Sequence, residues 1–113
     1  MAPLRLRPAL KRYAWGDAHR IPDLLGLPAS GEPVAEAWYG AHPQGPAEAL
    51  EGVVAGALDA RVAAAPEALL GAEVARRFGG LPYLLKLLAA ARPLSIQVHP
   101  DAAQAAEGFA REE

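Results

Sequence analysis

The segment Leu94-Ser-Ile-Gln-Val-His-Pro-Asp101 decides the fold prediction for this chain. Apolar and polar residues alternate along it, and residues two apart share one face of an extended strand. One predicted face carries Leu94, Ile96 and Val98, and the other carries Ser95, Gln97 and His99. Pro100 ends the predicted strand, because proline has no N–H to donate to a neighbouring strand. The segment therefore predicts a half-buried strand with one apolar and one polar face.

Gln97 and His99 are the candidate metal ligands on the polar face of this strand. At a rise of about 3.3 Å per residue their Cα atoms lie about 6.6 Å apart, so both side chains reach one point above the sheet. Imidazole is a common zinc ligand, whereas a glutamine carbonyl oxygen is an uncommon one. A strand whose polar residues only face water has the same spacing. The spacing alone leaves a metal site and a solvated face as open alternatives.

The composition excludes several classes of function. The 113 residues include 11 basic and 13 acidic side chains, with a formal net charge of −2, so electrostatics give no reason to expect a nucleic acid or an anionic membrane as partner. No apolar run approaches the roughly 20 residues of a membrane span. The chain has no cysteine, which suits the cytoplasm and restricts any metal site to nitrogen and oxygen ligands. We expect a cytoplasmic protein that acts on a small molecule.

Two further strands are predicted in the first half of the chain. Residues 4–7 alternate between Pro3 and Pro8, as a half-buried edge strand does. Residues 34–41 follow a turn-rich cluster and place Glu36 and Trp38 on one face. Glu36 is then either the acid of a pocket or a surface side chain whose stem covers the indole ring.

Short helices are predicted between the strands and after residue 101. The expected segments are residues 23–27, 57–65, 66–70 and 74–78, with Pro66 in a first helical turn. Asp101 suits the N-cap of a last helix, and Gln104 occupies the N3 position of a capping box.

Several segments resemble the type I mannose-6-phosphate isomerases, metal-dependent enzymes of the cupin superfamily. In the order expected for the N-terminal half of that family, they are Tyr13–Gly16, Glu36–Pro43, Leu81–Lys86, Pro93–Asp101 and Glu107–Glu112. The resemblance covers nearly the whole chain. It implies a mainly β fold with short helices, an incomplete cupin or jelly-roll-like barrel. It also implies that residues 1–113 are the N-terminal part of a longer catalytic domain.

Residues 81–91 are ambiguous without this resemblance. Their leucines and alanines follow a helical spacing and favour a helix. The resemblance argues for a strand, and we predict a strand that leads through residues 90–93 into Leu94. Lys86 then lies between Leu84 and Leu88 on one face. Its ammonium group either reaches water at an edge or pairs with an anion.

The resemblance implies a zinc-dependent aldose-ketose isomerase that interconverts mannose 6-phosphate and fructose 6-phosphate through a cis-enediol. Gln97 and His99 would bind one Zn²⁺ per chain, with the remaining ligands beyond residue 113. Ser95 would bind the phosphate of the sugar phosphate, and Trp15 would form a wall of the substrate pocket. Lys86 would lie in that pocket as one candidate for the general base.

One departure and two alternatives qualify this expectation. Many family members have a lysine where this chain has Ala102, so a role carried by that lysine is in doubt. The main alternative is a non-catalytic cupin module that binds a sugar or assembles with partners and lacks a complete metal site. A second alternative is an iron oxygenase, but those enzymes use two histidines and one carboxylate, and the predicted strand offers a single histidine.

Overall fold

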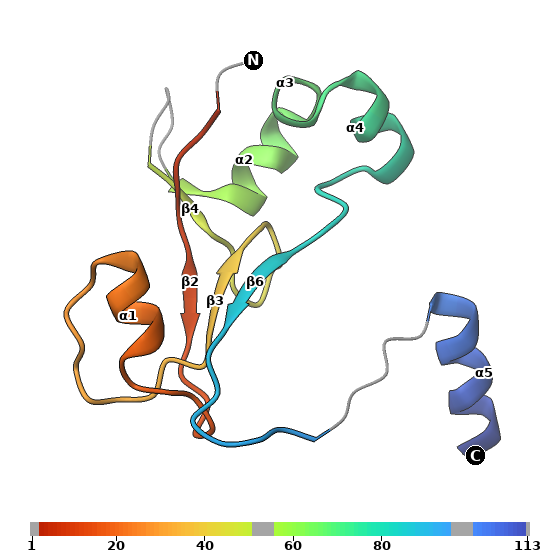
Figure 1. Ribbon diagram of the computed structural model, residues 1–113. Helices are drawn as coiled ribbons and strands as arrows, with labels where there is room; N and C mark the ends of the chain where they lie inside the picture. Colours follow the sequence, from red (N-terminus) through yellow and green to blue (C-terminus); the bar gives the residue numbers. More distant parts are fainter. Residues whose placement is uncertain (1–2, 51–55, 96–100, 113) are drawn as a thin grey trace.

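A computed structural model describes residues 3–50, 56–95 and 101–112. The described residues form two three-stranded antiparallel sheets and short helices (Figure 1). The predicted mixture of strands and short helices is confirmed, and within the described residues the two sheets are open and do not close into a barrel. None of the helices in this part of the chain is long and apolar enough to cross a membrane.

The larger sheet has the order β2-β3-β6 and forms the centre of the fold. Its strands are β2 (Ala9–Lys11), β3 (Glu36–Tyr39) and β6 (Leu85–Leu88). Leu10 is opposite Ala37, which is opposite Leu87 on the other side. Because side chains opposite one another share a face, these three residues belong to one apolar face. That face packs against the buried core residues Ile21 and Val34.

Helix α1 (Arg20–Leu25) supplies Ile21 to this core and lies beside β2 in Figure 1. Asp17 holds the start of the helix, because its Oδ2 accepts hydrogen bonds from the backbone N–H groups of His19 at 2.9 Å and Arg20 at 2.8 Å. These hydrogen bonds lower the pKa of the Asp17 carboxyl group. Gly26 ends the helix in the left-handed conformation, at φ 70°. The helical turn predicted at residues 23–27 is thus confirmed, with an earlier start.

The smaller sheet has the order β1-β4-β5, with β1 (Leu6–Arg7), β4 (Glu48–Ala49) and β5 (Gly56–Ala57). The predicted strand at residues 4–7 is confirmed in its second half. Beyond Pro8 the chain continues as β2, which the sequence analysis did not predict, and joins the other sheet. The N-terminal segment therefore links the two sheets.

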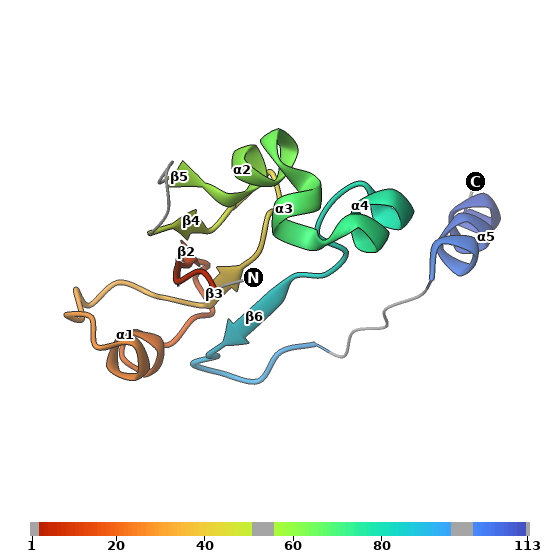
Figure 2. The same ribbon diagram turned by 90° about the horizontal axis from the view of Figure 1, so that it is seen from above.

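Three short helices follow the smaller sheet and gather at one end of β6 (Figures 1 and 2). They are α2 (Leu58–Ala64), α3 (Pro66–Leu70) and α4 (Ala72–Phe78). All three agree with the predicted helical segments to within two residues. Leu58 and Val62 of α2 are buried, and with Leu6 and Leu69 they line an apolar hollow of about 200 Å³. Gly79 ends α4 at φ 71°.

Two predictions at the end of the chain have different outcomes. The strand prediction for residues 81–91 is confirmed over residues 85–88, where β6 pairs with β3. The predicted strand at residues 94–98 is not tested, since residues 96–100 lie outside the described residues.

The predicted capping box at the start of α5 (Ala102–Glu112) is confirmed. The Gln104 N–H donates to Asp101 Oδ1 at 2.7 Å, and the Asp101 N–H donates to Gln104 Oε1 at 3.1 Å. Each side chain therefore satisfies a backbone donor of the other residue. Helix α5 lies apart from both sheets in Figures 1 and 2.

Candidate functional site

The second face of the β2-β3-β6 sheet is charged. The register places Lys11 opposite Glu36 and Trp38 opposite Lys86. These four side chains alternate along their strands with the apolar residues of the core, so they lie on the face that points away from α1. Two cations, one carboxylate and one indole ring are thus brought together from three strands.

Glu36 and Trp38 are joined by a buried hydrogen bond. The Trp38 Nε1–H donates to Glu36 Oε2 at 3.2 Å, and each residue is 7% exposed. A buried carboxylate without partners costs several kcal/mol, so this donor stabilises Glu36 in its position. Of the two interpretations from the sequence, the structure supports a buried acid more than a surface side chain.

Lys86 supplies the cation that faces this carboxylate. Its Nζ lies 4.0 Å from Glu36 Oε1 and 4.8 Å from the centroid of the Trp38 ring. The Lys86 side chain is 39% exposed, whereas that of Glu36 is 9% exposed. The ammonium group therefore pairs with an anion at its inner side and reaches solvent at its outer side. This arrangement combines the two alternatives that the sequence left open.

The loop after β3 covers the indole ring. His42 contacts the Trp38 ring edge-on, with 5.3 Å between ring centroids, and its Nδ1 accepts a hydrogen bond from the Gln44 N–H at 3.1 Å. Lys11 Nζ lies 4.3 Å from the Trp38 ring centroid and donates to the Gln44 backbone oxygen at 2.6 Å. The Trp38 ring is therefore surrounded by charged and polar side chains from the loop and from both neighbouring strands.

Trp15, the predicted pocket wall, lies in a loop beside the far end of β6. Its carbonyl oxygen accepts a hydrogen bond from the Ala91 N–H at 2.8 Å, and its ring contacts that of Tyr13 at a tilt of 34°, with 5.8 Å between centroids. The next residue, Gly16, contacts Ala35 so closely that a Cβ added to Gly16 would lie 2.5 Å from the Ala35 nitrogen. The loop is thus fixed against the strand that leads into residues 94–101.

Of the remaining predicted site residues, Ser95 is described and exposed. Gln97 and His99, the predicted metal ligands, lie outside the described residues. Within residues 3–50, 56–95 and 101–112, no group of three His, Cys, Asp or Glu side chains is placed to hold a metal ion. Two described side chains with possible metal-ligand atoms have other partners: Glu36 contacts Trp38 and Lys86, and His42 Nδ1 accepts a hydrogen bond from the Gln44 N–H. The described part of the chain therefore does not by itself fit a zinc ion.

Lys86 and Glu36 were each recognised from the sequence as candidate residues, but neither their pairing nor Lys11 was predicted. A partial signal existed, because each residue is a charged side chain on a predicted strand: Glu36 shares a face with Trp38, and Lys86 lies between two leucines. Which strands are neighbours, and in what register, is a property of the folded sheet. Lys11 gave no local signal, since it belongs to a basic segment without a predicted role.

Comparison with known proteins identifies relatives over almost the whole chain. The model of the family described as phosphomannose isomerase type I, catalytic domain, matches residues 4–113. The mannose-6-phosphate isomerase of Escherichia coli (strain K12) is 41% identical over 107 residues, which cover 92% of this chain and 27% of that protein. The human mannose-6-phosphate isomerase is 35% identical over 103 residues, 82% of this chain and 24% of that protein.

Solved structures give the same result for the fold. A crystal structure of mannose 6-phosphate isomerase from Salmonella typhimurium, bound to its substrate and a zinc atom, matches with a TM-score of 0.82 and 40% identity, over 96% of this chain and 28% of that one. A zinc-bound holo structure of mannose 6-phosphate isomerase matches with a TM-score of 0.83 and 39% identity, over the same shares of the two chains. The chain spans about a quarter of the length of these relatives.

The family model covers far more than half of the chain, and the fold matches solved members of the family along nearly its whole length. The predicted resemblance is confirmed: the chain belongs to the type I phosphomannose isomerases, within their catalytic domain.

Proposed function

We propose that the protein is a zinc-dependent mannose-6-phosphate isomerase, which interconverts mannose 6-phosphate and fructose 6-phosphate through a cis-enediol. The family supports this reaction, as does a relative whose crystal structure contains substrate and zinc. The single observation on this chain that carries the proposal is the Glu36–Lys86 pair, with 4.0 Å between Oε1 and Nζ, beside a buried indole. We further propose a cytoplasmic location, consistent with a chain that lacks cysteine.

Lys86 has the position and the chemistry of a proton-transfer group. A side chain that moves a proton between neighbouring carbons must be fixed relative to the substrate and accessible to it. Glu36 fixes the inner side of the Lys86 ammonium group, while 39% exposure of the side chain leaves its outer side accessible. Lys86 is therefore our candidate for the catalytic acid or base.

Ser95 and Trp15 complete the proposed substrate contacts. The Ser95 hydroxyl donates to the substrate phosphate, where a charge-assisted hydrogen bond is stronger than a neutral one. Trp15 forms a wall of the sugar pocket. The Ala91 N–H donates to the Trp15 carbonyl oxygen and so keeps its loop close to the segment that continues into Ser95.

Gln97 and His99 are the proposed zinc ligands, with one Zn²⁺ per chain and further ligands beyond residue 113. When bound, zinc acts as a Lewis acid on the sugar oxygens. We propose that the two open sheets belong to a cupin-like jelly roll. We expect residues 94–98 to form a strand of that fold, with Gln97 and His99 on its polar face.

Zinc content and isomerase activity of the full-length gene product test this proposal. We expect one zinc per chain and conversion of mannose 6-phosphate to fructose 6-phosphate. His99→Ala and Gln97→Ala are expected to lose zinc and activity together, whereas His19→Ala, which removes an exposed histidine, serves as the matched control. Full activity without zinc or in His99→Ala would refute the metal assignment. A folded wild-type protein with neither zinc nor activity would instead indicate a non-catalytic module.

A further inference from the structure

Lys11 is held by the backbone of the loop after β3. Its Nζ donates to the Gln44 carbonyl oxygen at 2.6 Å. Gly45, the next residue, approaches so closely that an added Cβ would lie 2.9 Å from both Cε and Nζ of Lys11 and 3.1 Å from Cε3 of Trp38. A fixed backbone acceptor and a close loop together restrict where the ammonium group of Lys11 can lie.

Among the described residues, this ammonium group is one of two cations that contact Trp38. Lys11 Nζ is 4.3 Å from the Trp38 ring centroid and Lys86 Nζ is 4.8 Å from it. Lys11 comes from β2 and Lys86 from β6, the strands on either side of β3. An aromatic face attracts cations electrostatically, so each lysine restrains the ring from its own side of the strand.

The position of the indole ring determines where its N–H points. That N–H donates to Glu36 Oε2 at 3.2 Å, while the other oxygen of the same carboxylate lies 4.0 Å from Lys86 Nζ. A connected series of contacts thus runs from the Gln44 carbonyl through Lys11, Trp38 and Glu36 to Lys86. Any change in the tilt of the ring moves the hydrogen bond that orients the carboxylate.

We propose that Lys11 is a positioning residue for Lys86. It acts through Trp38 and Glu36 by fixing the ring that orients the carboxylate. The effect on catalysis rests on the isomerase function proposed above, because it assumes that Lys86 takes part in the reaction. The effect on the geometry of Trp38 does not depend on that function.

The kinetic test compares Lys11→Met, Lys11→Arg and Arg12→Met in the zinc-loaded full-length protein. Lys11→Met keeps the aliphatic stem and removes the cation, and we expect kcat to fall about two- to fivefold with KM nearly unchanged, the size of an exposed cation–π contact. Lys11→Arg keeps a donor and a cation that stacks on an indole, so we expect it to restore kcat. A wild-type kcat in Lys11→Met, or an equal loss in Lys11→Arg, would overturn the proposal.

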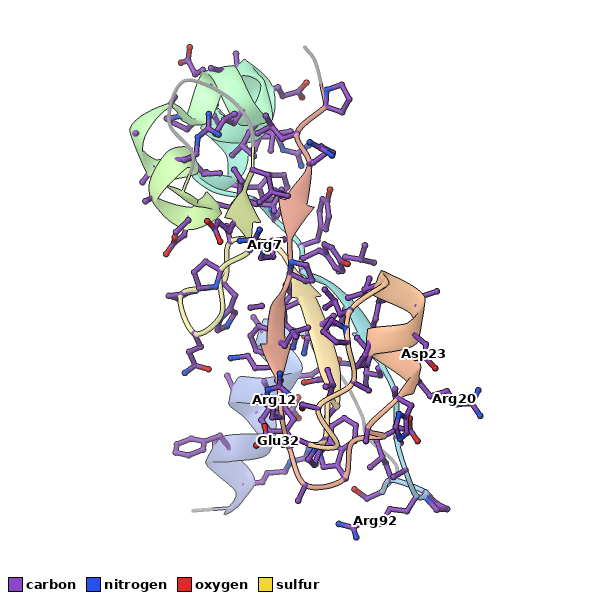
Figure 3. The ribbon with its side chains drawn as sticks, turned by 90° about the vertical axis from the view of Figure 1, so that its left-hand side faces the viewer. Arg7, Arg12, Arg20, Asp23, Glu32 and Arg92 are labelled. Atoms are coloured by element: carbon purple, nitrogen blue, oxygen red, sulfur yellow. The ribbon has the colours of Figure 1, made fainter. Side chains whose placement is uncertain are left out.

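Arg12→Met is the matched control because it removes the neighbouring cation. Arg12 pairs with Glu32 at 3.8 Å on the surface, and the two side chains lie side by side in Figure 3. We expect kcat to stay at the wild-type value in this variant. An equal loss of kcat in Arg12→Met would show that any cation in this segment suffices, and would contradict a specific role of Lys11.

A spectroscopic test separates this inference from the proposed function. In a Trp15→Phe background, Trp38 is the single tryptophan among residues 1–113, and its indole N–H NMR signal, identified in the full-length protein by its loss in Trp38→Phe, reports its hydrogen bond to Glu36. We expect Lys11→Met to shift this signal and Lys11→Arg to leave it close to the wild-type position. If the protein lacks isomerase activity, the proposed function fails while this signal still decides the role of Lys11. An unmoved signal in folded Lys11→Met would overturn the inference even in an active enzyme.

Discussion

Glu36 and Trp38, two residues apart on β3, are both buried and satisfy each other through the 3.2 Å bond from the indole Nε1–H to Oε2. Residues two apart on a strand share a face, so the contact is local in sequence. The carboxylate then has one oxygen left for Lys86, which is brought alongside by the pairing of β3 with β6. The contact between Trp38 and Glu36, close in sequence, thus orients the carboxylate for its contact with Lys86, which is distant in sequence.

Loss of the indole donor is expected to destabilise the protein. Trp38→Phe keeps an aromatic ring for the neighbouring cations but removes the N–H that satisfies Glu36. Leaving a buried acceptor without its partner costs about 1–3 kcal/mol in the free energy of unfolding, which urea denaturation measures. Trp15→Phe is the control, because Trp15 is only half-buried and its replacement is expected to cost less. Equal effects of the two substitutions would contradict the importance of the buried hydrogen bond.

Gly16 is expected to tolerate no side chain. A Cβ at this position would lie 2.5 Å from the nitrogen and 2.6 Å from the Cα of Ala35, and both are backbone atoms of the residue that precedes β3. Gly16→Ala is therefore expected to lower the free energy of unfolding by at least about 1–3 kcal/mol, as overpacking does. Gly80→Ala is the matched control, because a Cβ there meets nothing within 4 Å. A Gly16→Ala protein as stable as Gly80→Ala would show that the loop approaches β3 less closely.

The start of α1 is expected to weaken in acid. Hydrogen bonds from the backbone N–H groups of His19 and Arg20 lower the pKa of Asp17 in the folded protein. A carboxyl group with a lowered folded pKa contributes stability above its unfolded pKa of about 4, and this contribution disappears as the pH falls through the folded value. Asp17→Asn keeps a capping oxygen but no titrating group, so its unfolding free energy is expected to depend less on pH below 4. Identical pH profiles of wild type and Asp17→Asn would rule out this contribution.

Local features of the fold could be predicted from the sequence, whereas the pairing of distant strands could not. The capping box of Asp101 and Gln104 was predicted correctly, because both partners lie within one helical turn. The strand at β6 needed the family resemblance, since the spacing of its leucines equally suits a helix. The larger sheet was not predictable from local pattern, because β2 begins beyond Pro8, where the expected strand of residues 4–7 ends, and joins a different sheet from β1.

For the site residues too, local features were predictable from the sequence and long-range contacts were not. Glu36 and Lys86 were each recognisable as charged residues on a predicted strand, yet their proximity depends on the register of β3 with β6. Lys11 reaches Trp38 because β2 pairs with β3 and a loop carbonyl fixes its ammonium group. Neither fact has a local signature in the sequence.

Removing Lys86 is expected to destabilise the protein much more than removing the charge of its partner Glu36. Lys86→Met leaves the carboxylate of Glu36, which is only 9% exposed, without its cation. Glu36→Gln leaves the ammonium group of Lys86, which is 39% exposed, in contact with solvent. Because the buried group bears the larger cost of losing its partner, Lys86→Met is expected to lower the unfolding free energy more, by about 1–3 kcal/mol.

A double-mutant cycle in urea at pH 7 measures this pairing. The double variant carrying Glu36→Gln and Lys86→Met removes both charges, so we expect it to recover part of the stability that Lys86→Met loses. The pair Arg7–Glu48 is the control, with 3.1 Å between its atoms but side chains 65% and 49% exposed. Water screens this exposed pair, so Arg7→Met and Glu48→Gln are expected to couple by no more than about 1 kcal/mol, despite the shorter distance. If the effects of Glu36→Gln and Lys86→Met simply add, or if the exposed pair couples more strongly, burial does not govern the pairing, and Glu36 does not hold Lys86 in place.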